Sequence, residues 1–452
     1  MDEKEEQKNL ESFRNLLKNK QYAALRGRAQ DMNEADLAAL MEQMEDEDML
    51  KMFRLFPKEL AADVFSLLEQ DSQQYIITSL SEKEAGTIID NLYADDAADL
   101  LEEMPASVVK KLLAASSPDT RKDINHLLQY PDDSAGSVMT VEFVDLQENM
   151  TVTQAIDRIR SIGMDSETAN VCYVLNAKRL LLGNVTLRTL ILSRPDDLIA
   201  DIMNEDIVSV NTSTDQEKVA NLFSKYDITA MPVVDKENRM VGIITVDDVI
   251  DIMQSEATED IDKMNAIIPS DKPYLKTGVF DTWKKRFPWL LLLMISATFT
   301  GKIITGFEDS LSKYIILSAY IPMLMDTGGN AGSQASVEVV RGLSLDQIHF
   351  NDFFKVIWKE LRVGLLVGVT LAGANFVKCI LLDRVPVPVA LTVCATIICA
   401  VFFSKIIASV LVLLVSKLKF DPAVVASPML TTIIDALSLL IYFSVAKAVL
   451  HI

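Results

Sequence analysis

The feature that most constrains this chain is a set of long apolar stretches confined to its last 170 or so residues. A bilayer core of about 30 Å needs about 20 apolar residues per helix, and each stretch is long enough to cross it. The sequence therefore predicts a membrane domain of five helices within 281–452. The stretches lie at roughly 287–307, 314–340, 363–382, 387–416 and 423–448.

Charge divides the 452 residues into two unlike parts. From Asp281 onward there are 11 acidic and 15 basic residues, so this part carries +4; with −21 overall, the first 280 residues carry −25. A chain of this length is too long for one core, so several domains are expected. The segment Met1 to Glu11 is dense in Glu and Lys and lacks the apolar run of a secretory signal. We expect the amino terminus in the cytosol.

Basic residues in the loops give an independent test of orientation. Cytoplasmic loops carry an excess of Lys and Arg, and five spans place the two termini on opposite sides of the membrane. The loops on the side away from the acidic region offer only Lys313 and Arg384. We therefore expect a multi-pass protein of the plasma membrane, the inner membrane of a bacterium, with its carboxyl terminus outside and the lipid bilayer as a partner. The basic residues on the side of the acidic region are Lys284, Lys285, Arg286, Arg341, Lys355, Lys359, Arg362, Lys417 and Lys419.

The fifth apolar stretch contains a carboxylate at its centre. Asp435 lies 12 residues from either end of 423–447, which predicts a position at the bilayer midplane. Polar residues recur around it at helical spacing and predict one wet face. An ionised group there costs at least about 2.5–3.5 kcal/mol, so it must face a water-filled path, a bundle interior or a positive partner. The stripe comprises Ser427, Thr431, Asp435, Ser438 and Tyr442.

Two alternatives stay open in the membrane half. Lys405 of the fourth stretch could form a structural ion pair with Asp435. In the second stretch, the glycine-rich run Asp326–Gln334, which includes Asn330, permits either close helix packing or a locally broken helix whose backbone meets solvent or an ion.

The region 1–130 is predicted to be an acidic helical domain. Short helical units recur about every 12 residues, and each is too short to fold alone, so they are expected to stack in a solenoid-like manner. The units begin near Pro57, Asp71, Ser81, Asp95, Pro105 and Pro118.

From about Val138 a pattern of strand, helix and paired strands occurs twice, in 131–200 and 201–253. Such pairs resemble the tandem CBS domains of many regulated enzymes and transporters. In nucleotide-binding members, the resemblance implies that a Thr and an Asp three positions later hold ribose and phosphate. The second copy keeps both, as Thr245 and Asp248, whereas the first has Thr189 in place of the Asp. ATP is thus a candidate ligand of the CBS pair, with Thr245 and Arg188 as candidate contacts.

An acidic helix is expected between the second CBS copy and the membrane domain, with a connecting segment at 254–280. Its carboxylates could simply be a solvated face. Like-charged surfaces repel, however, and a divalent cation between them would remove the repulsion. The candidate ligands are Asp248, Asp251, Glu256, Glu259 and Asp260.

Taken together, the chain resembles the MgtE family of magnesium channels over nearly its whole length. The family order is a helical amino-terminal domain, two CBS domains, a connecting or plug helix and five membrane helices. The most specific matches are Gly328-Gly-Asn-Ala-Gly-Ser-Gln334, Ala257-Thr-Glu-Asp-Ile261 and the run from Asp421 to Asp435 that contains Thr-Thr-Ile-Ile-Asp.

The resemblance implies a homodimer whose pore is lined by the second and fifth helices. Asp435 corresponds to the selectivity carboxylate, with Asn330, Thr431 and Ser438 lining the path. Mg²⁺ would be both substrate and regulator, and its binding to the cytoplasmic domains would close the pore. The resemblance implies regulatory ligands at Asp95, Asp99, Glu217, Asp227, Asp248, Asp251, Glu256, Glu259 and Asp260.

Other functions are less consistent with these residues. A transporter of broader divalent range, including Co²⁺, or one coupled to an exchanged ion, remains an alternative. So does a membrane-anchored CBS sensor that does not conduct, although an anchor has no use for Asp435. We expect no enzyme, because no Ser/His/Asp or Cys/His arrangement is recognisable, and no nucleic-acid partner. The four cysteines lack the spacing of a disulfide framework or zinc site.

Overall fold

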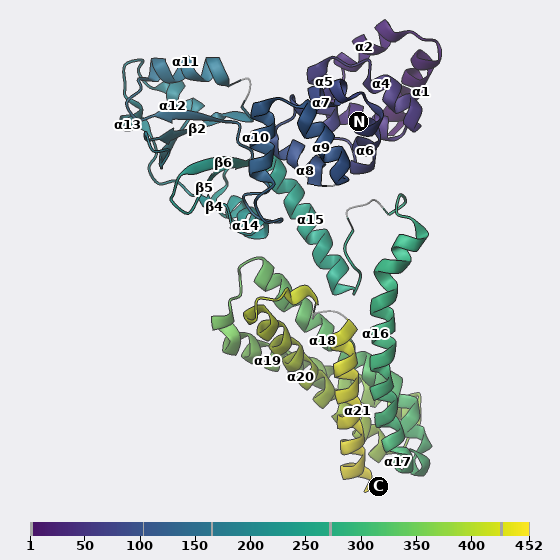
Figure 1. Cartoon of the computed structure of the whole chain (residues 1–452). Coiled ribbons are helices and arrows are strands. Elements are labelled where there is room, and N and C mark those ends of the chain that lie inside the picture. Colours follow the sequence, from purple (N-terminus) through teal and green to yellow (C-terminus); the bar gives the residue numbers. More distant parts are fainter. Residues whose placement is uncertain (1–2, 103, 164–165, 271–273, 425–427, 452) are drawn as a thin grey trace. The chain divides into compact units, whose positions relative to one another are not determined.

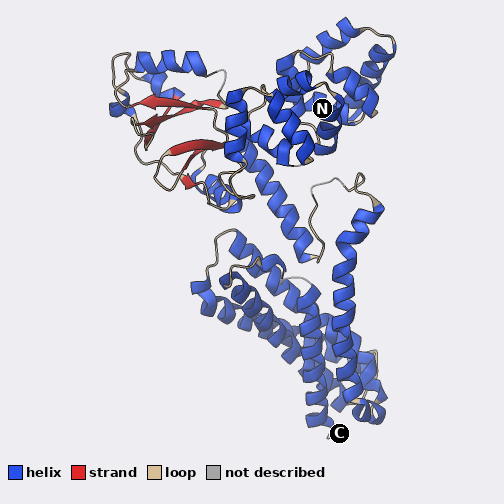
Figure 2. Ribbon diagram, viewed as in Figure 1, coloured by secondary structure: helices blue, strands red, loops and turns tan. Residues whose placement is uncertain are grey.

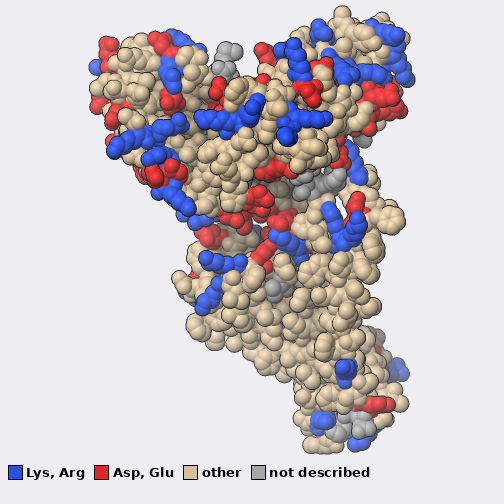
Figure 3. Space-filling view, in the orientation of Figure 1, with Lys and Arg blue, Asp and Glu red and all other residues tan. Residues whose placement is uncertain are grey.

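The computed structural model describes residues 3–102, 104–163, 166–270, 274–424 and 428–451. The chain divides into two compact units, Met1–Ile250 and Asp251–Ile452. Helices dominate both, and the described strands all belong to the first unit (Figures 1 and 2). Charged side chains gather on the surface of the first unit, whereas the surface of the long helices of the second is mostly uncharged (Figure 3).

The amino-terminal part of the first unit is a stack of short helices, which confirms the prediction from the repeated units. Local capping explains several of the starts: Ser81 and Glu84 form a reciprocal capping box, and Ser117 caps a helix that has proline in its first position. The helices are α1 (Glu3–Lys18), α2 (Tyr22–Gln30), α3 (Glu34–Glu42), α4 (Asp46–Phe53), α5 (Lys58–Ser66), α6 (Gln70–Ser79), α7 (Glu82–Ile89), α8 (Ala94–Glu102), α9 (Ala106–Ala115) and α10 (Pro118–Leu127).

Two small α/β repeats follow, each with a three-stranded sheet in sequence order. In each sheet the first two strands are parallel and the last two are antiparallel. The elements are β1 (Phe143–Gln147), α11 (Val152–Ile162), β2 (Thr168–Leu175), β3 (Leu181–Thr186), α12 (Leu187–Leu192), α13 (Ile199–Ile202), β4 (Val210–Asn211), α14 (Gln216–Tyr226), β5 (Ala230–Val234) and β6 (Met240–Thr245).

In each repeat, the segment before the first strand pairs with the other repeat. Thr140, ahead of β1, bridges to Ile243 of the second repeat, and Asn204, ahead of β4, bridges to Asn184 of the first. Glycine permits both approaches, because a Cβ at Gly183 would lie 2.5 Å from the Asn204 carbonyl oxygen. A Cβ at Gly242 would lie equally close to the Thr140 carbonyl oxygen. This reciprocal pairing confirms a tandem pair with internal pseudo-symmetry.

Helix α15 (Val246–Met264) leads from the last strand into the second unit. Among its described residues, four helices are long and apolar enough to cross a membrane: α16 (Val279–Gly306), α19 (Phe353–Leu381, with the preceding turn from Phe350), α20 (Val387–Lys417) and α21 (Pro428–Leu450). The other elements are α17 (Glu308–Lys313), η1 (Ile315–Tyr320), α18 (Ile321–Ser344), η2 (Phe350–Asp352) and η3 (Pro422–Val424).

The second predicted span, α18, is a helix of 24 residues but is less apolar than the other four. It is continuous through the glycine-rich run, so the alternative of a broken helix is wrong and close packing explains the glycines. A Cβ at Gly328 would collide with the Ser438 hydroxyl oxygen, and one at Gly332 with the Ile434 side chain. Small residues thus let α18 and α21 approach closely.

Candidate functional site

Asp435 lies on α21 beside the backbone of α18. A Cβ at Gly329 would be 3.5 Å from the Asp435 Oδ1 atom and 3.3 Å from the Thr431 methyl carbon. The Asp435 side chain is only partly buried within the single chain. The sequence predicted Asp435 at the centre of a helix spanning 423–447. Helix α21 is described from Pro428 to Leu450, so Asp435 lies about two turns into the described helix.

The predicted polar stripe of α21 faces two different environments. Thr431 is partly exposed, like Asp435, and its hydroxyl donates to the Pro428 carbonyl at 2.7 Å. Ser438 is fully buried against Gly328, and Tyr442 is buried with its hydroxyl donating to the Leu317 carbonyl at 2.9 Å. Ser438 therefore packs between helices in this chain and does not line open space, contrary to the prediction. Ser427 lies outside the described residues.

Helix α18 carries a second polar stripe that sequence reasoning recognised only in part. Asp326, Asn330, Gln334 and Glu338 follow one another at a spacing of four, and all four are exposed. They share one helix face, while small residues of the opposite face are buried. Asp326 also acts electrostatically on Asp435, so the two stripes lie near each other. The spacing of four was visible in the sequence and could have identified Gln334 and Glu338 beside Asn330.

Lys405 does not pair with Asp435. Its ammonium lies 3.6 Å from Glu360 Oε2, and both side chains are at least nine-tenths buried between α19 and α20. Removing one partner of such a buried pair strongly destabilises the fold, because the other charge is left uncompensated. The alternative that explained Asp435 by Lys405 is therefore wrong, and the carboxylate needs another explanation.

Within the first unit, six carboxylates act on one another; we call them the six-carboxylate cluster. Asp95 is the most buried member, with 9% of its surface exposed, and its Oδ1 atom has no hydrogen-bond partner. Thr245 donates its hydroxyl to Asp248 Oδ2 at 2.6 Å. The members come from α8, the segments before β1 and β2, and the first turn of α15: Asp95, Asp96, Glu142, Glu167, Asp247 and Asp248.

Three members of the cluster, Asp95, Asp96 and Glu167, have raised pKa values. Burial, followed by repulsion from Asp96, Asp248 and Glu167, raises the pKa of Asp95 well above its usual range. Burial and the charges of Asp248, Asp247 and Glu142 raise the pKa of Asp96 to about 6. The same two causes, with Asp248 as the strongest charge, raise the pKa of Glu167 to about 8. A cation placed among these groups would reverse the shifts.

The other predicted regulatory residues lie on α8 and α15 and at the two ends of α14. Asp99 is exposed, one turn beyond Asp95 on α8. Glu217 lies in the first turn of α14, whereas Asp227 caps its other end in the left-handed conformation, with φ of 51°. Asp251 is exposed on α15. In the described part of the chain, no three acidic, thiol or imidazole groups stand close enough to form a ready-made metal site.

The carboxyl-terminal turn of α15 shows a different arrangement of carboxylates. Lys263 forms ion pairs with Glu259 at 2.6 Å and with Asp421 at 2.7 Å. Burial lowers the pKa of Lys263, but hydrogen bonds to Asp421 and Glu259 outweigh it, so the pKa is raised. Burial, then the charge of Asp421, raises the pKa of Asp260. Glu256, the remaining predicted ligand here, is partly exposed on the preceding turn.

The turn after the last strand has matching local geometry in the two repeats. Thr245 donates to Asp248, and at the same place in the first repeat the Thr186 and Thr189 hydroxyls are 2.9 Å apart. Thr189 thus occupies the position of Asp248, as the sequence predicted, without its charge. Arg188 is exposed beside it.

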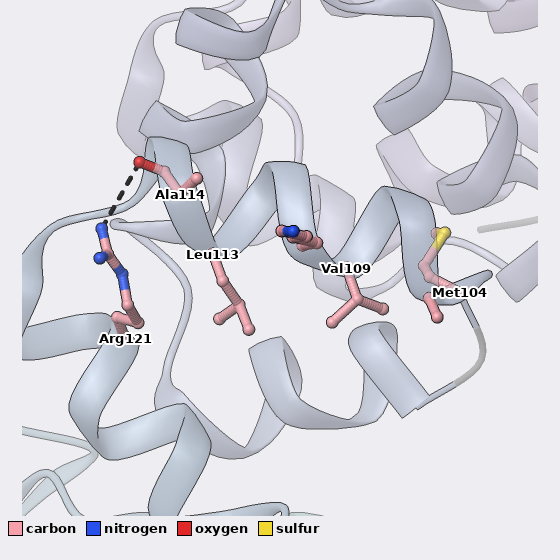
Figure 4. Close-up of a pocket in the computed structure, with 7 residues that line it drawn as sticks. Met104, Val109, Leu113, Ala114 and Arg121 are labelled. Carbon is pink, nitrogen blue, oxygen red and sulfur yellow. Dashed lines mark hydrogen bonds between the residues drawn. The ribbon is translucent and has the colours of Figure 1, made fainter.

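A cavity of about 530 Å³ lies between α9 and α10 (Figure 4). Met104, Val109 and Leu113 give it an apolar lining, and Arg121 donates from its rim to the Ala114 carbonyl at 3.4 Å. The charged groups that line it, Lys110 and Arg121, are cationic. It is therefore unsuited to a metal ion.

Sequence comparisons identify the same three parts. A family profile described as a divalent cation transporter, MgtE, matches residues 321–445. The MgtE intracellular N domain matches 32–133, and a CBS domain matches 199–255.

Relatives that match about three quarters of the chain agree with these profiles. The magnesium transporter MgtE of Thermus thermophilus is 40% identical over 334 residues, which is 74% of each chain. That of Bacillus subtilis is 33% identical over 340 residues, 75% of this chain and 74% of the relative.

Two solved structures match slightly more than half of the chain. The cytosolic domain of the Mg²⁺ channel MgtE in complex with ATP is 38% identical, with a TM-score of 0.52, over 54% of this chain and 99% of that one. The soluble part of a magnesium transporter is 31% identical, with a TM-score of 0.53, over 56% and 99%. The helical amino-terminal part, the CBS pair and the apolar helices thus occur in the same order as in these relatives, and the chain belongs to the MgtE family of magnesium transporters.

Proposed function

We propose that this chain imports Mg²⁺ through the plasma membrane, down the electrochemical gradient of the ion, along a pore enclosed by two copies. The observation that carries the proposal is the exposed polar face of α18, where Asp326, Asn330, Gln334 and Glu338 have no place against lipid. Polar and ionisable groups at membrane depth belong in a bundle interior or a water-filled cavity. A second copy facing this stripe would supply such a path.

Asp435 is the proposed ion-binding carboxylate of this path. Mg²⁺ releases its waters reluctantly and demands octahedral geometry, so two carboxylates facing each other across a twofold axis would hold the hydrated ion through water. Asn330 and Thr431 lie on the exposed sides of α18 and α21 and could orient those waters. In this proposal Ser438 supports the packing of α18 and does not contact the ion.

The proposed regulator is Mg²⁺ itself, bound in the acidic cytoplasmic region. Carboxylate oxygens are the ligands that Mg²⁺ prefers, and the buried Asp95 Oδ1 atom without a hydrogen-bond partner fits a cation. Binding would relieve the repulsion within the six-carboxylate cluster and favour the closed pore. Asp99, Glu217, Asp227 and the acidic residues of α15 are candidates for further regulatory sites.

ATP is a candidate second ligand of the CBS pair. The support is the related cytosolic domain that was solved with ATP. In this chain the Thr245 hydroxyl donates to Asp248, so a nucleotide would have to share or replace that hydrogen bond. The other candidate contact, Arg188, is exposed in the first repeat. Binding of a labelled ATP analogue to Thr245→Val and Arg188→Ala variants tests this assignment.

Flux into liposomes decides the pore assignment. We expect Asp435→Asn to reduce Mg²⁺ influx by at least about tenfold, because it removes the charge that attracts the ion. Asp346→Asn, a substitution of an exposed loop carboxylate, is the matched control and should leave influx unchanged. Normal influx through the Asp435→Asn variant would exclude Asp435 as the ion site.

A pore of broader divalent selectivity is the second candidate, because the matching family profile describes a divalent cation transporter. Competition of Co²⁺ with Mg²⁺ influx, measured with and without an opposing ion gradient, separates a selective channel from a broader or exchange-coupled transporter. Equal permeation by Co²⁺ would favour the second candidate.

A further inference from the structure

One ammonium group joins two separate elements at the carboxyl-terminal turn of α15. Lys263 Nζ lies 2.6 Å from Glu259 Oε1 on its own helix and 2.7 Å from Asp421 Oδ2, between α20 and η3. The Lys263 side chain is 23% exposed and that of Asp421 is 33% exposed, so the contact is partly withdrawn from solvent. The Lys263 ammonium binds two carboxylates at once, so it is more constrained than a lysine in a single exposed ion pair.

Asp421 uses its other oxygen for the backbone. Its Oδ1 atom accepts a hydrogen bond from the Ala423 N–H at 2.8 Å, which fixes the η3 turn ahead of α21. The residue after Lys263, Met264, packs against a hydrophobic cluster that contains Val339 and Val340 of α18 together with Ala423. The position of Lys263 is therefore linked to the segment that precedes α21.

The same turn also reaches the end of α18. Asp260 forms a side-chain hydrogen bond with Ser344, the last residue of that helix. The final turn of α15 thus contacts both the end of α18 and the segment leading into α21. These are the two helices that the proposed function places around the ion path.

We propose that Lys263 is a positioning residue that couples α15 to the two pore helices, by bridging Glu259 and Asp421 as a cation tethered to the chain. The proposal rests on the proposed function. Asp260, Glu259 and Asp421 would repel one another without a cation between them. Lys263 provides that charge at every Mg²⁺ concentration, so a movement of α15 is passed to α18 and α21 whether the pore is open or closed.

Mg²⁺ flux at low and high Mg²⁺ on the cytoplasmic face of liposomes tests the coupling. We expect Lys263→Gln to conduct normally at low Mg²⁺ but to close poorly, with flux at high Mg²⁺ about tenfold above that of the unmodified chain. Lys263→Arg keeps the charge and should restore closure. A Lys263→Glu/Asp421→Lys exchange should close better than either single variant.

Two results would overturn the proposal. Closure of Lys263→Gln at the usual Mg²⁺ concentration would show that the bridge transmits nothing. Closure at a lower Mg²⁺ concentration would show that Lys263 competes with a regulatory ion at Glu259 instead of coupling the helices.

A readout independent of transport separates this proposal from the proposed function. Trypsin cleaves after accessible lysines, and the bridge protects Lys263, so Asp421→Asn should accelerate cleavage after Lys263 in the full-length protein, whereas Asp346→Asn should not. If the unmodified chain carries no Mg²⁺ flux, the proposed function fails while faster cleavage still supports the bridge. Unchanged cleavage in Asp421→Asn would refute the bridge itself.

Discussion

Two groups of carboxylates in this molecule balance their charge in different ways. In the six-carboxylate cluster, the charges that act most strongly on Asp95, Asp96 and Glu167 are other carboxylates. At the end of α15, Glu259 and Asp421 share the ammonium of Lys263. The first group gains from a cation supplied by the solution, whereas the second has one supplied by the chain.

We propose that this difference separates sensing from transmission. A cluster of repelling carboxylates changes its free energy when Mg²⁺ binds, so it can report the ion concentration. A bridge that carries its own cation keeps its geometry across that range and can transmit a movement. The predictions below test whether the two groups divide the work in this way.

The largest effect is expected from neutralising the sensing group. In the triple variant Asp95→Asn/Glu167→Gln/Asp248→Asn, the repulsion that Mg²⁺ relieves is gone, so flux should close only at an Mg²⁺ concentration about tenfold or more above normal. Liposome flux against cytoplasmic-side Mg²⁺ measures this. A triple variant of exposed acids in the same unit, Glu148→Gln/Asp196→Asn/Glu237→Gln, is the control. Normal closure in the cluster variant would contradict the sensing role.

Neutralising Glu256, Glu259 and Asp260 together gives the corresponding test on α15. If these residues bind regulatory Mg²⁺, the pore should stay open at high Mg²⁺. Because Glu259 also holds Lys263, the same variant weakens the bridge, so Glu256→Gln alone distinguishes the causes. A shift caused by Glu256→Gln indicates ion binding, and a shift confined to the triple variant indicates loss of coupling.

The sequence predicted the helical units and the tandem repeats, because each leaves a local signal, and it singled out Asp435 as a candidate ion-binding residue. Capping residues such as Ser81 mark a helix start, and glycines such as Gly242 mark a close approach of backbone. A carboxylate in an apolar stretch is equally conspicuous. These features depend on neighbours along the chain, and one sequence is enough to read them.

The sequence did not predict which charges meet. Glu167 directly precedes β2 in the first repeat, 25 residues after Glu142, and reaches the cluster because β2 pairs with β1 and brings it beside Glu142. Lys405 was an open alternative partner of Asp435, because nothing in the sequence indicates that α19 presents Glu360 to it. Ser438 was placed on the pore face because helical spacing cannot distinguish a wet stripe from one packed on glycine.

A single substitution in the cluster should raise stability when Mg²⁺ is absent. Glu167→Gln removes one of the repelling charges, so the melting temperature of the full-length protein in EDTA should rise by about 2–4 °C, equivalent to about 1 kcal/mol. The stabilisation by added Mg²⁺ should shrink by a similar amount. Glu148→Gln, at an exposed site, should change neither value. A lower melting temperature in EDTA would show that Glu167 is held by favourable contacts instead.

The pH dependence of the melting temperature tests whether the surroundings of Glu167 disfavour its ionised form. The pKa of Glu167 is raised from its usual 4.5 to about 8, so the folded state binds this proton more tightly than the unfolded state. Its contribution is complete below pH 4.5 and is lost as the pH rises through 8. In EDTA, the melting temperature should therefore fall between pH 6 and 8.5, and fall less in Glu167→Gln. Thermal unfolding in paired buffers measures the difference, and equal slopes would count against the raised pKa.

The smallest effect is expected from the bridge, and its independence from Mg²⁺ is the informative part. Lys263→Gln removes a partly exposed pair worth at most about 1 kcal/mol, so the melting temperature should fall by about 1–2 °C. Because the chain supplies this cation, the fall should be the same in EDTA and in Mg²⁺, unlike the change caused by Glu167→Gln. A fall seen only in EDTA would mean that Mg²⁺ replaces Lys263 at Glu259 and Asp421, which would make the two carboxylate groups alike.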